Sequence, residues 1–187
     1  MAELDYNYIG DLVESARSGD SDAFAELYAA TYRHQYLFAY NYLKDEYLAQ
    51  DALQETYITA LKNLSTLKDP KLFVSWLNQI NFRICYNLSV KQSRFNAETE
   101  AYSGLEYTDY AAPAEYTPES QVVRVDSERY LLQQVMALPF SESQAIFLHY
   151  YKNTKIEDIA YLLEISKSTV KRNLASGKKH LAASLVK

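Results

Sequence analysis

The last helix-forming stretch of the chain carries side chains that could bind DNA. No acidic residue follows Glu164, and the exposed positions of a helix predicted over residues 167–181 are basic or hydroxylic. These positions are Lys167, Ser168, Lys171 and Arg172, followed by Lys178 and Lys179. Lysine and arginine bind phosphates or guanine edges, and a serine near a helix N-terminus can bind either. A helix of this composition suits the major groove of duplex DNA.

The residues around this basic helix have the spacing of a helix-turn-helix. A preceding helix is predicted over residues 156–163, where the small Ala160 would let the two helices cross closely. Ile165 would fill the turn, and Ser166 would cap the second helix. The apolar positions are Ile159, Ala160, Leu163, Ile165, Val170 and Leu174. An ordinary helical hairpin with a solvated basic face is the alternative, but the cap, the spacing and the missing acids favour DNA binding.

A second polar group lies on one face of an earlier predicted helix. Asp51, Gln54 and Glu55 are spaced at i, i+3 and i+4, which places them on one side of that helix. They are opposite an apolar stripe, and the apolar positions of the helix are Leu48, Ala52, Leu53, Tyr57, Ala60, Leu61 and Leu64. Taken alone, such a patch is more typical of a solvated helix face than of a binding surface.

Aromatic and basic residues are interleaved in the next segment. Pro70 interrupts the helices in a short loop over residues 65–71, and a further helix is predicted over residues 72–93. That helix contains Trp76 and the basic residues Arg83, Lys91 and Arg94. Basic side chains among aromatic ones can stack bases and hold a single strand. Taken alone, Trp76 is more typical of a core residue, and the basic residues of a solvated helix face.

The composition indicates a mostly helical chain. The 187 residues include only four Gly and four Pro, and 48% of them are hydrophobic. This composition excludes collagen, low-complexity disorder and a membrane protein, and the scarcity of Gly and Pro favours helices over turn-rich β folds. The single cysteine, Cys85, cannot form an internal disulfide and is predicted to fill a buried apolar site. Because the chain shows no signal peptide and no run of about 20 apolar residues, we expect a cytoplasmic protein without membrane insertion.

The charges are sorted along the chain. Residues 1–55 carry eleven acids and three basic residues, whereas residues 56–95 carry six basic residues and one acid. Residues 96–121 hold six acids and no Lys or Arg, and residues 122–187 hold ten basic residues and six acids. Two separate basic surfaces could therefore each meet a polyanion. The acidic stretch contains two prolines and lacks a helical apolar period, which predicts a linker.

Beyond the linker, two more helices are predicted before the helix-turn-helix. The first covers about residues 120–138 and ends at Pro139. The second continues to about residue 151, and Ser141 is its predicted N-cap.

Short motifs also occur in a specific order along the chain. In the N-terminal part they are Gly19-Asp20, Ala23-Phe24, Glu26-Leu27-Tyr28 and Gln50-Asp51-Ala52-Leu53-Gln54-Glu55-Thr56-Tyr57, then Phe73 with Trp76-Leu77 and Ile80. In the C-terminal part they are Leu138-Pro139, Phe147-Leu148, Tyr150-Tyr151, Ile159-Ala160, Leu163, Ile165-Ser166 and Thr169-Val170-Lys171. Over about residues 9–94 and 121–185, the chain resembles bacterial sigma factors of the sigma-70 family, in the extracytoplasmic-function group.

The resemblance implies an all-α protein with two small helical domains joined by a flexible acidic linker. Residues 1–95 would form a region 2-like domain, residues 96–120 the linker, and residues 121–187 a region 4-like helix-turn-helix domain. Such a protein binds core RNA polymerase through its two large subunits and directs promoter-specific transcription initiation. Whether an anti-sigma factor masks these surfaces stays open.

The resemblance also implies roles for individual residues. Asp51, Gln54 and Glu55 would bind the clamp coiled coil of one large polymerase subunit. The loop would capture a base flipped from the minus 10 strand and the following helix would line that strand, through Ser65, Lys68, Lys71, Trp76, Arg83, Asn87, Lys91 and Arg94. The C-terminal domain would contact the flap of the other large subunit and bind the minus 35 element through Lys167, Ser168, Thr169, Lys171, Arg172 and Lys178.

Some positions depart from the family pattern. Glu164 replaces a usual turn glycine, which predicts a strained turn. Gly177 lies inside the last predicted helix and is expected to weaken it by about 1 kcal/mol relative to alanine. Asn173 stands where the family commonly has Arg, and Asn78, Gln79 and Asn81 stand where it is often more basic or aromatic.

Two alternative functions come from other classes. A helix-turn-helix regulator would bind duplex DNA without polymerase, and it would leave Asp51, Gln54 and Glu55 without a role. An enzyme is not expected, because the three His residues are scattered and no Gly-rich phosphate loop occurs. The sequence therefore predicts no catalytic residue, no metal site and no cofactor.

Overall fold

The computed structural model describes residues 5–100 and 130–185 of the chain. All regular elements in these ranges are helical, which confirms the predicted fold class. The helices are α1 (Tyr6–Arg17), α2 (Ser21–Leu43), α3 (Glu46–Asn63), α4 (Phe73–Glu100), α6 (Phe140–Ile146), α7 (Ile156–Leu162) and α8 (Lys167–Leu185). Two short 3-10 helices, η1 (Leu64–Thr66) and η2 (Pro70–Leu72), lie between α3 and α4, and the π-helix η3 (Phe147–Tyr151) follows α6. Residues 130–136 are also helical.

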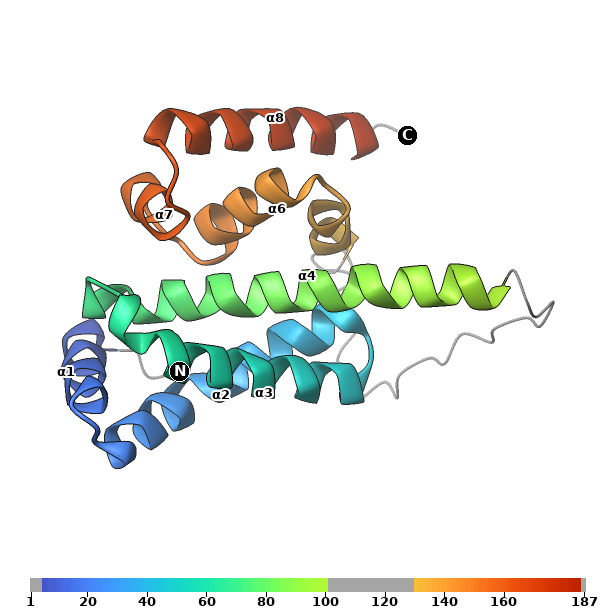
Figure 1. The fold of residues 1–187 in the computed structure, drawn as a ribbon. Helices are drawn as coiled ribbons and strands as arrows, with labels where there is room; N and C mark the ends of the chain where they lie inside the picture. The colour runs from blue at the N-terminus through green and yellow to red at the C-terminus, as the bar shows by residue number, and fades with distance from the viewer. Residues whose placement is uncertain (1–4, 101–129, 186–187) are drawn as a thin grey trace, which may run out of the picture.

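The long helix α4 lies in the middle of the molecule. Figure 1 shows α1, α2 and α3 on one side of α4 and α6, α7 and α8 on the other. The helix continues to Glu100, beyond the predicted end at residue 93 and into the segment predicted as a linker. The rest of that linker lies outside the described residues.

Aspartate side chains begin the first three helices. Asp5, Asp20 and Asp45 have extended backbone, and each accepts hydrogen bonds from backbone N–H groups in the first turn of the following helix. A capping carboxylate satisfies donors that have no partner within the helix and interacts favourably with the helix dipole. The local sequence therefore determines where the first three helices begin.

The first four helices enclose an apolar cluster. Its buried members include Ile9, Val13, Leu27, Tyr57, Leu64, Leu67, Phe73, Trp76 and Leu77. Trp76 is only 8% exposed, as expected for a core residue. Leu61, one of the recurring apolar residues of α3, is 55% exposed and does not contribute to this cluster.

A buried polar network joins α2 to α4. Gln35 Nε2 donates to Asn78 Oδ1 (2.8 Å), and Asn81 Nδ2 donates to both oxygens of Gln35 (2.8 and 2.9 Å). Because an unpaired buried polar group costs roughly 1–3 kcal/mol, these bonds favour one register between the helices. Cys85 lies beside the network, and burial raises the pKa of its thiol to about 12. Two of the unusual asparagines of α4 are therefore structural, and Cys85 is a buried filler as predicted.

The helix-turn-helix forms as predicted. Ile159, Ala160, Val170 and Leu174 are buried between α7 and α8, and Ile165 is half-buried beneath the turn. The backbone N–H of Thr169 donates to Ser166 Oγ (3.1 Å), so Ser166 caps α8. Glu164 has a φ of 54°, which places a non-glycine residue in the left-handed region and confirms the expected strain.

One local expectation about the C-terminal half was wrong, and another described only part of the role of its residue. Ser141 is not an N-cap, because α6 begins at Phe140 after Pro139, and that end has no side-chain cap. Gly177 does not simply weaken α8: a Cβ atom at this position would lie 2.5 Å from Ile146 Cδ1. The glycine lets α8 approach α6 closely. Nearby, Glu142 accepts hydrogen bonds from Ser176 Oγ (2.8 Å) and His180 Nδ1 (2.7 Å).

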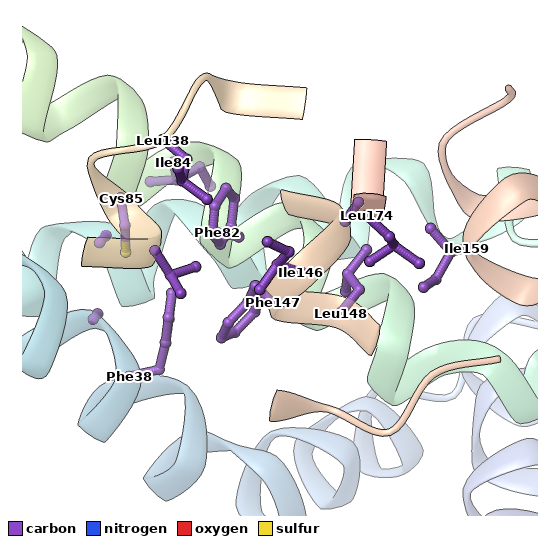
Figure 2. Close-up of a cluster of buried hydrophobic side chains, with 14 of the residues drawn as sticks. Phe38, Phe82, Ile84, Cys85, Leu138, Ile146, Phe147, Leu148, Ile159 and Leu174 are labelled. Carbon is purple, nitrogen blue, oxygen red and sulfur yellow. The ribbon is translucent and has the colours of Figure 1, made fainter. Parts of the chain in front are cut away.

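A second apolar cluster joins the two halves of the chain. Phe147 lies with its ring centroid 4.5 Å from that of Phe38 and 5.1 Å from that of Phe82 (Figure 2). The same cluster contains Cys85 from the N-terminal half and Ile146, Leu148, Ile159 and Leu174 from the C-terminal half. Burial of each large side chain contributes roughly 1.5–3 kcal/mol. In addition to the N-terminal cluster, the two helical domains therefore share this second core.

Candidate protein and nucleic-acid interfaces

The exposed face of α3 carries the predicted polar patch. Asp51, Gln54 and Glu55 are all exposed, on the side of the helix opposite its buried alanines. Three apolar side chains extend this face along the helix: Tyr47 (80% exposed), Ile58 (45%) and Leu61 (55%). Sequence reasoning missed them, although the spacing of four residues from Tyr47 to Asp51 could have indicated a shared face.

A buried side chain and several hydrogen bonds hold the loop between α3 and α4. Leu67 is buried in the N-terminal core, Thr66 Oγ1 donates to Asn63 O (2.7 Å), and Asp69 accepts from the backbone N–H of Lys71 (3.0 Å). The side chains of Ser65, Lys68 and Lys71 are exposed around this anchored loop. The loop backbone is therefore fixed, and the ammonium groups of Lys68 and Lys71 extend from it into solvent.

One face of α4 combines basic and aromatic side chains. Arg83, Asn87, Lys91 and Arg94 are exposed, and their spacing of three or four residues keeps them on one side of the helix. Tyr86, Asn87, Val90, Lys91, Arg94 and Phe95 line a groove of about 630 Å³. This is the combination of side chains that binds a single nucleic-acid strand. Trp76 is not part of this face, because its indole lies in the core.

The first turns of α8 carry the other basic group. Lys167, Ser168, Lys171 and Arg172 are exposed, and Thr169 is half-buried. Lys167 Nζ lies 3.2 Å from Glu157 Oε1 on α7. A backbone hydrogen bond and, after it, this contact with Lys167 lower the pKa of Glu157. Exposed ion pairs contribute little stability, so the ammonium group of Lys167 can exchange this partner for a phosphate at small cost.

Lys178 lies apart from this end of α8. Its Nζ atom is 4.8 Å from the ring centroid of Tyr150. It borders an apolar groove of about 580 Å³ that sequence reasoning missed, lined by Leu131, Val135, Ile146, Tyr150, Tyr151, Lys178 and Leu181. The residues that form the groove come from three segments of the chain, so no local pattern could have indicated it.

The structure brings part of the two predicted DNA surfaces together. A cavity of about 600 Å³ lies between α4, α6 and α8. Arg83 and Asn87 line it from the N-terminal half, and Thr169 and Arg172 line it from the C-terminal half. Lys91, Arg94, Lys167 and Lys171 are not part of its lining.

Two other kinds of feature are absent from the described residues. In the described ranges, no group of three or more His, Cys, Asp or Glu side chains could hold a metal ion. No helix in that part of the chain is long and apolar enough to cross a membrane.

Comparison with known proteins assigns both halves of the chain to one family. Residues 27–95 match the family model for sigma-70 region 2, and residues 128–181 match that for sigma-70 region 4. Together the two models cover most of the chain. The chain is 26% identical to the ECF RNA polymerase sigma factor SigW of Bacillus subtilis, over 92% of this chain and 94% of SigW. It is 27% identical to the RNA polymerase sigma-H factor of Pseudomonas aeruginosa, over 87% of this chain and 86% of that protein.

Solved structures show the same fold. CnrH, in its complex with the cytosolic domain of CnrY, superposes with a TM-score of 0.62 at 18% identity, over 95% of this chain and 97% of CnrH. The sigma factor RpoE of Bartonella quintana, in its complex with the anti-sigma factor NepR, gives a TM-score of 0.58 at 18% identity, over 87% of this chain and 96% of RpoE. With both family regions present in order, this chain belongs to the sigma-70 family, in its extracytoplasmic-function (ECF) group.

Proposed function

We propose that this chain binds core RNA polymerase and directs it to specific promoters by recognising minus 10 and minus 35 DNA. The observation that carries the proposal is the order of a region 2 domain and a region 4 domain, each with an exposed basic surface. A regulator that binds only duplex DNA would need the second domain alone. The chain needs no catalytic group for this role, because RNA synthesis belongs to the polymerase and its magnesium, and it would act with that enzyme in the cytoplasm.

The exposed face of α3 is the proposed contact with the polymerase clamp. Asp51, Gln54 and Glu55 offer acceptors to basic and amide groups on the partner helix pair. The exposed Ile58 and Leu61 flank these acceptors and would become buried on binding. Apolar burial beside charged contacts is the usual composition of a stable protein interface.

The loop after α3 and the basic face of α4 form the proposed minus 10 site. Lys68 and Lys71 would hold the phosphates next to a base that has left the duplex. Flipping a base costs a few kcal/mol of lost stacking, so the protein must supply compensating contacts. Arg83, Asn87 and the groove lined by Lys91 and Arg94 would guide the rest of the strand.

The first turns of α8 form the proposed minus 35 site. A helix-turn-helix places the N-terminal part of its second helix in the major groove. Lys167, Ser168, Lys171 and Arg172 occupy those turns, whereas Lys178 borders the apolar groove beside Tyr150. We assign that groove to the polymerase flap, so Lys178 would contact protein as well as DNA.

Protein inhibitors are a further class of partner for this chain. CnrH and RpoE were each solved with a bound protein, the cytosolic domain of CnrY and the anti-sigma factor NepR. By analogy with these proteins, an anti-sigma factor would bind this chain and keep it from the polymerase.

Charge reversal on α3 tests the proposed function. The chain is mixed with bacterial core RNA polymerase, and both co-elution and run-off transcription from the DNA upstream of its own gene are measured. We expect wild type to co-elute and give a discrete transcript, and Asp51→Lys and Glu55→Lys each to reduce both at least tenfold. Asp11→Lys is the matched control, because Asp11 is exposed on α1, away from α3. Binding of duplex DNA without polymerase binding would instead favour the regulator.

A further inference from the structure

The cavity between α4, α6 and α8 carries positive charge without a counter-charge. Arg83 of α4 and Arg172 of α8 both line this space of about 600 Å³, and no described Asp or Glu belongs to its lining. Among the described residues, neither guanidinium group has an ion-pair or hydrogen-bond partner. A concave site with one sign of charge attracts ions of the opposite sign, and guanidinium groups bind phosphates through paired hydrogen bonds. The charge of the cavity therefore favours a phosphorylated ligand.

Four side-chain amides line the same cavity, and none of them forms a hydrogen bond within the described part of the chain. They are Gln79 and Asn87 on α4, Gln144 on α6 and Asn173 on α8. Only 5% of Gln144 is exposed, so the cavity is where its amide can find a partner. Because each amide offers both an acceptor and two N–H donors, this lining suits the edge of a heterocyclic base or the hydroxyl groups of a sugar.

Aromatic and aliphatic side chains complete the lining. The ring centroids of Tyr86 and Phe140 lie 4.7 Å apart, with an interplanar angle of 55°, and both side chains are half-buried. Phe140 also packs on Phe82, with a distance of 5.9 Å between the ring centroids. Leu163 and Ile165 add aliphatic surface from the end of α7 and the turn after it. Anchored aromatic rings of this kind stack on nucleobases.

The volume of the cavity decides what size of ligand it admits. Pockets that bind small molecules and cofactors have volumes of about 300–1,000 Å³ and combine apolar walls with a few polar groups. The space of about 600 Å³ lies within that range. A DNA duplex does not fit, because its major groove alone is about 12 Å wide. A nucleotide has the required size, and it combines anionic groups, a flat ring and hydrogen-bonding edges.

We propose that the cavity between α4, α6 and α8 binds a nucleotide. Its phosphates would contact Arg83 and Arg172, and its base would lie against Tyr86 and Phe140 within reach of the Gln144 amide. Because the lining comes from both halves of the chain, a bound nucleotide would stabilise their packing by mass action. Binding of the nucleotide does not depend on the proposed function.

Calorimetric titration of the full chain tests the proposal. ADP, GDP, CDP and UDP are titrated separately into the free protein, without magnesium. We expect at least one of them to bind at a single saturable site. Its nucleoside and pyrophosphate, titrated alone, should each bind at least tenfold more weakly, because each lacks part of the groups that the cavity recognises. If no diphosphate binds, the proposal is wrong. Equally tight binding of pyrophosphate would also overturn it, since the site would then recognise an anion and not a nucleotide.

Two substitutions locate the bound nucleotide in the cavity. Arg172→Gln removes a guanidinium group from an exposed position and should weaken binding at least tenfold. Gln144→Leu removes the buried amide at similar volume and should weaken binding about two- to tenfold. Arg33→Gln is the matched control, because Arg33 is exposed on α2 and does not line the cavity. Unchanged affinity of Arg172→Gln would overturn the proposal even if Gln144→Leu does not fold, as judged by circular dichroism.

A short DNA strand shares the chemistry of a nucleotide and is the second probe. Five nucleotides from the DNA upstream of the gene are titrated into the same proteins. If this strand binds through Arg172 and Gln144 and no nucleoside diphosphate binds, the cavity serves a strand and the proposal is wrong. These titrations contain no polymerase, so a negative result leaves the run-off test of the proposed function unaffected. Failure of the run-off test would in turn leave a measured nucleotide site in place.

Discussion

The N-terminal and C-terminal halves of the chain bury their side chains in different ways. The N-terminal half has three long helices with aspartate caps or buried polar bonds, and it encloses an apolar cluster that is largely its own. In the C-terminal half, α6 and α7 span seven residues each, and neither has a side-chain cap. Isolated helices shorter than about 12–15 residues are marginal in water, so these two depend on packing.

This difference bears on function. The C-terminal half gains part of its burial from Phe38 and Phe82 of the N-terminal half, on the side of α4 that also bears Arg83 and Tyr86. That side of α4 carries part of the proposed minus 10 surface, so the packing that stabilises the short helices of the C-terminal half lies beside a surface assigned to DNA. The internal polar network of the N-terminal half favours a single packing of its helices.

The largest expected effect comes from the side chain that both halves share. Phe147→Ala should lower the free energy of unfolding by about 3–5 kcal/mol, because it leaves a cavity against Phe38 and Phe82. Urea unfolding is followed by circular dichroism and by the fluorescence of Trp76, the only tryptophan, which lies in the N-terminal half. If the two halves unfold together, the unfolding midpoints of both signals shift to a lower urea concentration.

Tyr47→Ala is the matched control, because Tyr47 is 80% exposed and its loss should change stability by less than about 0.5 kcal/mol. If the urea midpoint measured by Trp76 fluorescence stays unchanged while the helical signal is lost at lower urea, the two halves unfold independently. The C-terminal half would then not be coupled to the N-terminal half through Phe147.

A smaller effect tests the packing within the C-terminal half. Gly177→Ala should destabilise the chain by about 1–3 kcal/mol, because the new methyl group would lie 2.5 Å from Cδ1 of the buried Ile146 and force that side chain to repack between α6 and α8. The gain in helix propensity, about 1 kcal/mol, opposes this cost. Thermal unfolding measures the net change. Ala175→Gly, at an exposed position of the same helix, isolates the propensity term. A more stable Gly177→Ala protein would show that α6 and α8 can separate at little cost.

The smallest expected effect is a gain in stability at the turn. Glu164→Gly should stabilise the chain by about 1 kcal/mol, because glycine adopts the φ of 54° without a Cβ clash. Glu164→Gln keeps that clash and removes the charge, so it should be near neutral. A higher unfolding midpoint for Glu164→Gly but not for Glu164→Gln would show that the left-handed backbone at this position strains the C-terminal half. Equal shifts from both variants would assign the effect to charge.

Local patterns were enough to predict much of the molecule. The apolar spacing around Ala160 and Val170 predicted the helix-turn-helix, and the spacing of Asp51 and Glu55 predicted one exposed face. These predictions succeeded because a helix converts a separation of three or four residues into a shared side. Ser141 was mistaken for a cap because serine is common there, while the turn begins one residue earlier, after Pro139.

The sequence by itself determined the helical class, the family and which residues are basic on which helix, because these depend on composition and on separations within one helix. Only the tertiary structure decided that Asn78 and Asn81 are buried around Gln35 and that Gly177 is a point of close contact. It alone brought α7 onto the loop near Lys68. Contacts between residues almost a hundred positions apart depend on how whole helices pack. The periodic patterns within a single helix do not predict that packing.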